Sequence, residues 1–267
     1  MGTESRNPRS MGLSDMGTKE ILRLMNEENE NAVRAVEACL PEIAALSDLY
    51  AEVLRAGGRV FYLGAGTSGG LALLDAAEMP PTFSLAEDVV IALPAEKDMR
   101  FLTADEDDPA LAARRLAERG CSAGDLVIGI AASGSTPYVA EGLRYARSAG
   151  AKTAAVACNP GSLIGQLADV AIEADTGPEV LTGSTRLKAG NAQKMILNMI
   201  STAAMVKLGK VRSNLMVDMR PTNAKLVRRA CSMIVELTGC SEAEAEAALA
   251  SGESVSQAVD RLLAERE

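Results

Sequence analysis

The run RVFYLG, Arg59–Gly64, with AGTSG after it at 65–69, indicates the fold class most clearly. The run is apolar at consecutive positions, which is typical of a β-strand covered on both faces. Four further apolar runs of this kind come later in the chain: DVVIAL (88–93), DLVIGIAA (125–132), KTAAVAC (152–158) and DVAIEA (169–174). Helical patterns separate most of these runs, and strand–helix–strand units of this length require parallel strands. The sequence therefore predicts an α/β fold with a five-stranded parallel sheet sandwiched by helices.

The residue pattern changes on both sides of these five runs. Residues 1–15 are polar and rich in Gly, Pro and Ser, and residues 18–56 have apolar positions at helical intervals. Residues 187–208 predict one long, largely buried helix, and residues 221–265 are Ala- and Glu-rich and helical, with glycines as breaks. We predict three parts: an N-terminal arm and helices packing on the core (1–57), the sheet domain (58–218) and a small C-terminal helical appendage (219–267).

Composition excludes several classes of protein. The chain has 267 residues, 48% of them hydrophobic, and a net charge of −9. No apolar run is long enough to span a membrane, and no lysine and arginine clusters suit a nucleic acid. The 5 cysteines are scattered without a CxxC pair, which favours reduced thiols over a disulfide frame or a zinc site. We therefore expect a cytoplasmic protein that binds neither nucleic acid nor a membrane.

The absence of histidine is the most restrictive feature of the composition. Ser-His-Asp hydrolases, Cys-His proteases and His-ligated metal centres are excluded in their usual form. Proton transfers in an enzyme built from this chain would fall to Glu, Asp, Lys, Tyr or Cys.

Two glycine- and hydroxyl-rich loops follow the first and third predicted strands, where ligands bind in open parallel sheets. Glycine lets the backbone approach an anion, and hydroxyls with amides at a helix N-terminus supply donors to phosphate oxygens. The same residues also make tight turns and N-caps, but two such loops at equivalent strand ends favour anion binding. Neither loop has the lysine of a P-loop, and the second strand ends in Leu93-Pro94 without the acidic residue of a dinucleotide site. The candidate ligand-binding residues of the two loops are Gly66, Thr67, Ser68, Ser133, Gly134, Ser135 and Thr136.

A third hydroxyl-rich turn, TGSTRLK at 182–188, precedes the long helix and contributes Ser184 and Lys188 as candidates. Helix capping and anion binding explain this turn equally well. Glu179 lies in the loop GPEV after the fifth strand and is a further candidate for the site.

Two other carboxylates are candidates for acid–base work. Glu78 precedes Pro80-Pro81, which predicts a helix end, and its apolar sequence neighbours predict partial desolvation and a raised pKa. Glu106 lies in DEDDP (105–109) at the start of the next helix, where the helix dipole alone accounts for an acidic residue.

Several longer strings resemble those of N-acetylmuramic acid 6-phosphate etherases. They cover most of the chain: LGAGTSG (63–69), LDAAEMPPTF (74–83), GIAASGSTPYV (129–139), CNPGS (158–162), GPEV (177–180) and TGSTRLKAGNAQKMILNMISTAAMVKL (182–208). The resemblance implies a sugar isomerase (SIS) domain, here the phosphosugar-binding domain at 58–218, usually in a homodimer with sites near the subunit interface. It implies no metal and no organic cofactor.

The resemblance also implies the chemistry. Family members cleave the D-lactyl ether of N-acetylmuramic acid 6-phosphate in cell-wall sugar recycling, a lyase reaction that gives N-acetylglucosamine 6-phosphate and D-lactate. The glutamate of DAAE, here Glu78, would donate the proton to the departing lactate, and Glu106, in the acidic string, would act as the base. Two carboxyls in different environments can divide acid and base duties without a histidine.

The chain departs from the family pattern at the residues that grip anions. Gly70 and Ser135 stand where members usually carry arginines, and the loop at 92–97 replaces a glycine-rich one and is shorter before Glu106. Two alternatives therefore stay open: an SIS enzyme for another phosphosugar without a carboxylate, and a non-catalytic phosphosugar-sensing regulator.

Overall fold

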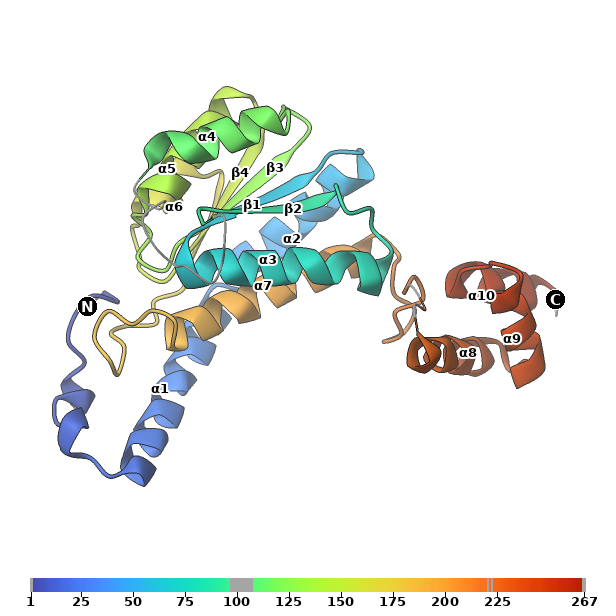
Figure 1. The fold of residues 1–267 in the computed structure, drawn as a ribbon, viewed down its shortest axis with the longest axis horizontal. Coiled ribbons are helices and arrows are strands. Elements are labelled where there is room, and N and C mark those ends of the chain that lie inside the picture. The colour runs from blue at the N-terminus through green and yellow to red at the C-terminus, as the bar shows by residue number, and fades with distance from the viewer. Residues whose placement is uncertain (1, 97–107, 220, 222, 266–267) are drawn as a thin grey trace. The chain divides into compact units, whose positions relative to one another are not determined.

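The structure is a computed structural model that describes residues 2–96, 108–219, 221 and 223–265. Figure 1 shows its helices and strands in chain order: η1 (Pro8–Ser10), η2 (Leu13–Asp15), α1 (Thr18–Ala38), α2 (Leu40–Arg55), β1 (Val60–Gly64), α3 (Gly66–Phe83), β2 (Val90–Pro94), α4 (Pro109–Glu118), β3 (Leu126–Ile130), α5 (Pro137–Ser148), β4 (Lys152–Ala157), α6 (Leu163–Leu167), β5 (Val170–Glu173), α7 (Lys188–Lys207), α8 (Ala224–Thr238), α9 (Glu242–Ala250) and α10 (Val255–Ala264).

The five strands form one parallel sheet in the order β2-β1-β3-β4-β5. Gly64, the last residue of β1, is in register with Pro94 of β2 on one side and with Ile130 of β3 on the other. This topology confirms the predicted fold class. Because the strands are parallel, the segments that follow β1, β2 and β3 leave the sheet at the same edge.

Helices cover both faces of the sheet, as the continuously apolar strands require. In Figure 1, α4, α5 and α6 lie on one face, and α2, α3 and α7 lie on the other. Under α5 the core includes Leu63, Tyr138 and Leu143, all fully buried. The packing is close at Gly142, where an added Cβ would lie 2.3 Å from the Leu63 Cδ1 atom. A glycine in α5 thus lets the helix approach β1.

One predicted helix end is wrong. α3 continues through Pro80 and Pro81 and ends at Phe83. The two prolines lack the N–H that bonds to the preceding turn, but the helix bond from Ser84 N–H to the Pro80 carbonyl forms beyond them. The predicted helical stretch at 18–56 is two helices, with Cys39 between α1 and α2.

The chain divides into two compact units, 1–76 with 88–204 and 77–87 with 205–267. The second unit contains α8, α9 and α10 around a core of its own that includes Ile234, Ala245 and Val259. Its helix ends follow the sequence closely: Gly239 ends α8 in the left-handed conformation at φ 70°, and Ser241 begins α9 with a capping box. None of the helices in the described part of the chain combines the length and the apolar composition that a membrane span requires.

Candidate functional site

The first loop (residues 64–69) turns directly from β1 into α3. Gly66, the first residue of α3, has φ +55°, a left-handed conformation that glycine adopts without strain. The Ser68 side chain is buried, and its Oγ donates to Gln193 Oε1 on α7 at 3.0 Å. Thr67 is half-buried. The Ser68 hydroxyl is therefore fixed by an amide from a distant part of the same unit.

An acidic side chain already contacts the first loop. Glu96, just after β2, is 5% exposed, and its Oε1 accepts from the Gly66 N–H at 2.7 Å. This N–H lies at the positive end of the α3 dipole, where an anion is stabilised. One of the donors that we expected for a ligand anion is thus taken by the protein.

The second loop (residues 133–136) turns from β3 into α5. Ser133 Oγ accepts from the Ser135 N–H at 3.3 Å and from Ser135 Oγ at 3.1 Å, which leaves the Ser133 O–H free to donate elsewhere. Thr136 is the N-cap residue of α5, and its side chain makes no capping hydrogen bond. The hydroxyls of Ser133 and Thr136 are therefore available as neutral donors at one helix N-terminus.

Two contacts hold the second loop in shape. Gly134 has φ +75°, and an added Cβ there would lie 2.3 Å from the Ser162 Cβ, so only glycine fits. Asn159 Nδ2 donates to the carbonyls of Ala132 and Ser133, each at 3.2 Å. Since β1 and β3 are neighbours in register, the two loops lie side by side at one edge of the sheet.

Two charged residues at the third turn, Glu179 and Lys188, make internal contacts. Glu179 is buried and accepts from the backbone N–H groups of Lys188 at 3.2 Å and Ala189 at 2.9 Å, so its carboxylate caps α7. Burial raises the pKa of Glu179 above its ordinary range, although the two N–H bonds oppose this shift. Ser184 is half-buried. Substrate binding by these residues stays a prediction.

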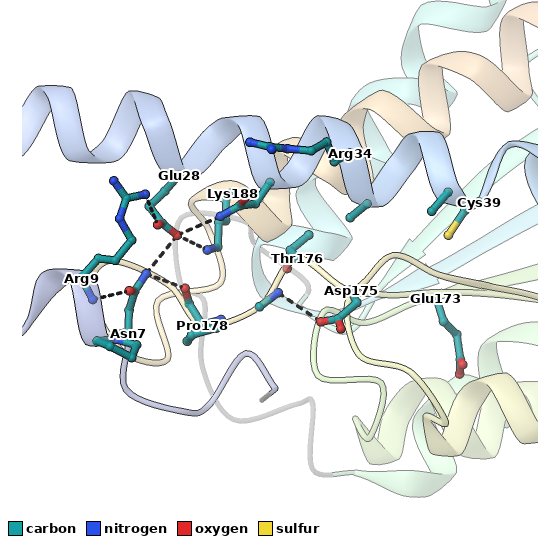
Figure 2. A pocket seen from close by; sticks show the side chains of 15 residues that line it. Asn7, Arg9, Glu28, Arg34, Cys39, Glu173, Asp175, Thr176, Pro178 and Lys188 are labelled. Atoms are coloured by element: carbon teal, nitrogen blue, oxygen red, sulfur yellow. Dashed lines mark hydrogen bonds and ion pairs between the residues drawn. The ribbon is translucent and has the colours of Figure 1, made fainter.

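The Lys188 ammonium pairs with Glu28 of α1, and both side chains are almost fully buried, at 2% and 4% exposed. Figure 2 shows Asn7, Arg9 and Lys188 converging on the Glu28 carboxylate. Burial opposes the ionisation of Glu28, but bonds from Lys188, Asn7 and Arg9 lower its pKa below the ordinary range. This cluster ties the N-terminal arm and α1 to the start of α7. The cluster lines a cavity of about 650 Å³, whose wall carries side chains of both charges.

The structure describes one of the two carboxylates that we expect to transfer protons. Glu78 lies near the end of α3, in the second unit, and its side chain is exposed, so the expected desolvation is wrong for the single chain. Its sequence neighbours Leu74 and Ala77 are exposed with it, because they share the outward face of the helix. Glu106 lies outside the described residues.

Sequence reasoning missed Glu96, Gln193 and Asn159. Each acts through a contact with a residue more than 25 positions away. No local pattern marks such a contact, although Glu96 does belong to the loop that departs from the family. Among the described residues, no group of three or more Cys, Asp or Glu side chains could hold a metal ion.

Comparisons with known proteins agree with this architecture. The SIS domain family matches residues 25–158 and again residues 117–203, and the C-terminal lid domain of glucokinase regulatory protein matches residues 213–262. N-acetylmuramic acid 6-phosphate etherase from Serratia proteamaculans is 52% identical over 98% of this chain and 90% of its own length. The chain belongs to the N-acetylmuramic acid 6-phosphate etherase family. An etherase from Yersinia pestis is 54% identical over 92% of this chain and 85% of its own length.

Solved structures of other proteins share the fold of this etherase family member. A phosphoheptose isomerase from Neisseria gonorrhoeae has a TM-score of 0.54 at 20% identity, and the match covers 70% of this chain and 98% of that one. A phosphoheptose isomerase from Francisella tularensis has the same TM-score at 17% identity, over 72% and 100%. The SIS fold is therefore shared with isomerases.

Proposed function

We propose that this chain is a carbon–oxygen lyase that cleaves the D-lactyl ether of N-acetylmuramic acid 6-phosphate, giving N-acetylglucosamine 6-phosphate and D-lactate. The observation that carries the proposal is the identity of 52% and 54% to two etherases over 98% and 92% of the chain. The reaction would recycle a sugar of the cell wall.

The second loop is the part of the site that suits the phosphate. Ser133 offers a hydroxyl donor, because its Oγ accepts from Ser135, and Thr136 adds another at the N-terminus of α5, where the helix dipole favours an anion. Ser135 replaces the arginine that family members usually carry. The phosphate would therefore be bound by neutral donors and the dipole, without a bidentate guanidinium from this position.

The reaction needs two proton transfers. Once the sugar ring is open, its aldehyde acidifies the C2 proton, and Glu106 removes that proton as the base. Glu78 protonates the C3 ether oxygen, the C3–O bond breaks, and lactate leaves with that oxygen. Water then adds to the double bond and supplies the hydroxyl at C3 and the hydrogen at C2. The exposure of Glu78 supports this role, because an acid that protonates a substrate must be reachable by it.

We also propose a cytoplasmic homodimer. An apolar groove of about 490 Å³ lies between α2 and α7, and Leu40 and Met199 beside it are 47% and 39% exposed. Exposed apolar patches of this kind commonly mark interfaces between proteins. The free, buried cysteines suit a reducing compartment.

One observation favours a second candidate. The missing arginines at Gly70 and Ser135 would suit a phosphosugar that lacks a carboxylate, on which the same two acids would act.

The test is incubation of the purified chain with N-acetylmuramic acid 6-phosphate and enzymatic detection of D-lactate. We expect release well above a blank, and weaker substrate binding in Ser133→Ala, which removes a hydroxyl donor of the second loop. No release from a folded protein would contradict the lyase and leave the second candidate.

A further inference from the structure

The N-terminal arm (residues 2–10) runs along the edge of the sheet at which the second loop lies. Thr3 N–H donates to Asn159 Oδ1 at 2.8 Å, in the segment that follows β4. Asn7 Nδ2 donates to the Pro178 carbonyl at 3.1 Å, in the segment that follows β5. Because the strands are parallel, both segments leave the sheet at the edge that carries the second loop. The arm therefore contacts the side of the molecule on which the candidate site is built.

Asn159 joins the arm to the second loop. An asparagine amide has one oxygen that accepts and one nitrogen with two N–H donors. The Asn159 oxygen accepts from the Thr3 N–H, and its nitrogen donates to Thr3 Oγ1 at 2.9 Å as well as to the carbonyls of Ala132 and Ser133. Since these bonds decide which end of the amide faces the loop, the arm determines the orientation of the side chain that holds the second loop.

The arm is held firmly enough to act in this way. Thr3 is fully buried, whereas Arg9 of the same arm is exposed. Toward its other end the arm is anchored by Asn7 and Arg9, which donate to the Glu28 carboxylate at 3.0 and 2.9 Å (Figure 2). Loss of the Thr3 hydroxyl would remove the nearest acceptor of the Asn159 N–H groups, and a buried donor that loses its partner costs free energy.

We infer that Thr3 is a positioning residue, which through Asn159 holds the second loop in the shape that binds the substrate. The inference rests on the proposed function, which assigns the second loop to the substrate. It gives the N-terminal arm a role in substrate binding, in addition to its packing on the core.

The test is Thr3→Val, which replaces the hydroxyl with a methyl group and keeps the backbone N–H. We expect about fivefold or more weaker binding of N-acetylglucosamine 6-phosphate in calorimetry, and the same rise in KM for D-lactate release. Because the proposed acids are unchanged, kcat should change by less than about twofold. Thr3→Ser restores the hydroxyl and should behave as wild type. Thr18→Val, at an exposed threonine that begins α1, is the matched control and should change neither constant.

A double-mutant cycle tests the route through Asn159. Asn159→Ala should itself weaken sugar phosphate binding, and Thr3→Val should add nothing further in that background, because the contact is already lost. Full additivity of the two substitutions would mean that Thr3 does not act through Asn159, and would overturn the inference.

Unchanged affinity and unchanged KM in folded Thr3→Val would also overturn it, even if urea unfolding showed lower stability, because the contact would then be structural only. If Thr3→Val fails to fold, Thr3→Ala removes the same hydroxyl with less bulk and should show the same loss of affinity. A wild-type chain that binds the sugar phosphate without releasing D-lactate would contradict the proposed function, and the affinity of Thr3→Val would still decide the inference. A wild-type chain that does neither would contradict both.

Discussion

At the scale of residues, turnover should depend on both proposed proton carriers. Glu78→Gln and Glu106→Gln each remove a proton carrier while keeping shape, so we expect each to lower kcat by about 100-fold or more. Steady-state D-lactate release measures this, and Glu87→Gln, at an exposed acid in the same unit as Glu78, is the control. Near-wild-type rates in either variant would show that its role is misassigned.

Local sequence determines the surroundings of these and other site residues to different degrees. Gly134 requires a left-handed backbone in a tight loop, and its residue type alone makes that conformation predictable. The hydrogen bond from the Gly66 N–H to Glu96 joins two strand ends, and no spacing in the sequence predicts it. For Glu78 the predicted burial is wrong, because its sequence neighbours Leu74 and Ala77 are exposed with it on the same helix face.

The Glu28 cluster predicts how stability depends on pH. Lys188, Asn7 and Arg9 lower the folded-state pKa of Glu28, so the unfolded chain binds a proton more readily at acid pH. This contribution to the free energy of unfolding is full above the ordinary pKa of 4.5 and is lost as pH falls through the lower, folded value. Glu179, whose pKa is raised, contributes a slope of the opposite sign.

Urea unfolding at a series of pH values tests this slope. Relative to wild type, Glu28→Gln should lose part of the decline in stability on the acid side of pH 4.5. An identical acid limb in both proteins would mean that Glu28 does not titrate differently in the folded chain.

At the scale of elements, the sequence pattern predicts correctly those helices and strands whose own residues determine their structure. The five apolar runs become the five strands, and Gly239 and Gly252 separate the C-terminal helices. The pattern fails where surrounding residues determine the structure, as in α3, which continues through Pro80 and Pro81. The fold was therefore predictable from periodicity and glycine positions, whereas the detailed contacts of the site were not.

Helix α5 should tolerate no side chain at Gly142. An added Cβ would lie 2.3 Å from Leu63 Cδ1 and 2.9 Å from Ala112 Cβ, so Gly142→Ala should lower the free energy of unfolding by about 1–3 kcal/mol despite the better helix propensity of alanine. Gly124→Ala, where nothing lies within 4 Å, is the matched control in chemical denaturation. Equal stability of the two variants would contradict the close packing of α5.

At the scale of the whole molecule, the groove between α2 and α7 predicts assembly. Met199→Glu would place a charge in an apolar interface, so we expect it to shift the sedimentation of the chain from dimer toward monomer. Leu163→Glu, at a position 40% exposed on α6, controls for an added surface charge and should stay dimeric. A wild-type chain that sediments as a monomer at all concentrations would contradict the proposed dimer.

The proposed reaction is an elimination followed by addition of water, and solvent labels at C2 and C3 of the product separate it from direct displacement by water at C3. When N-acetylmuramic acid 6-phosphate is converted in ¹⁸O-labelled ²H₂O, mass spectrometry should find one carbon-bound deuterium at C2 and one labelled oxygen at C3 of N-acetylglucosamine 6-phosphate, and no label in the ether-derived hydroxyl of D-lactate. A product without deuterium at C2, label in that lactate hydroxyl, or no lactate at all would contradict the elimination.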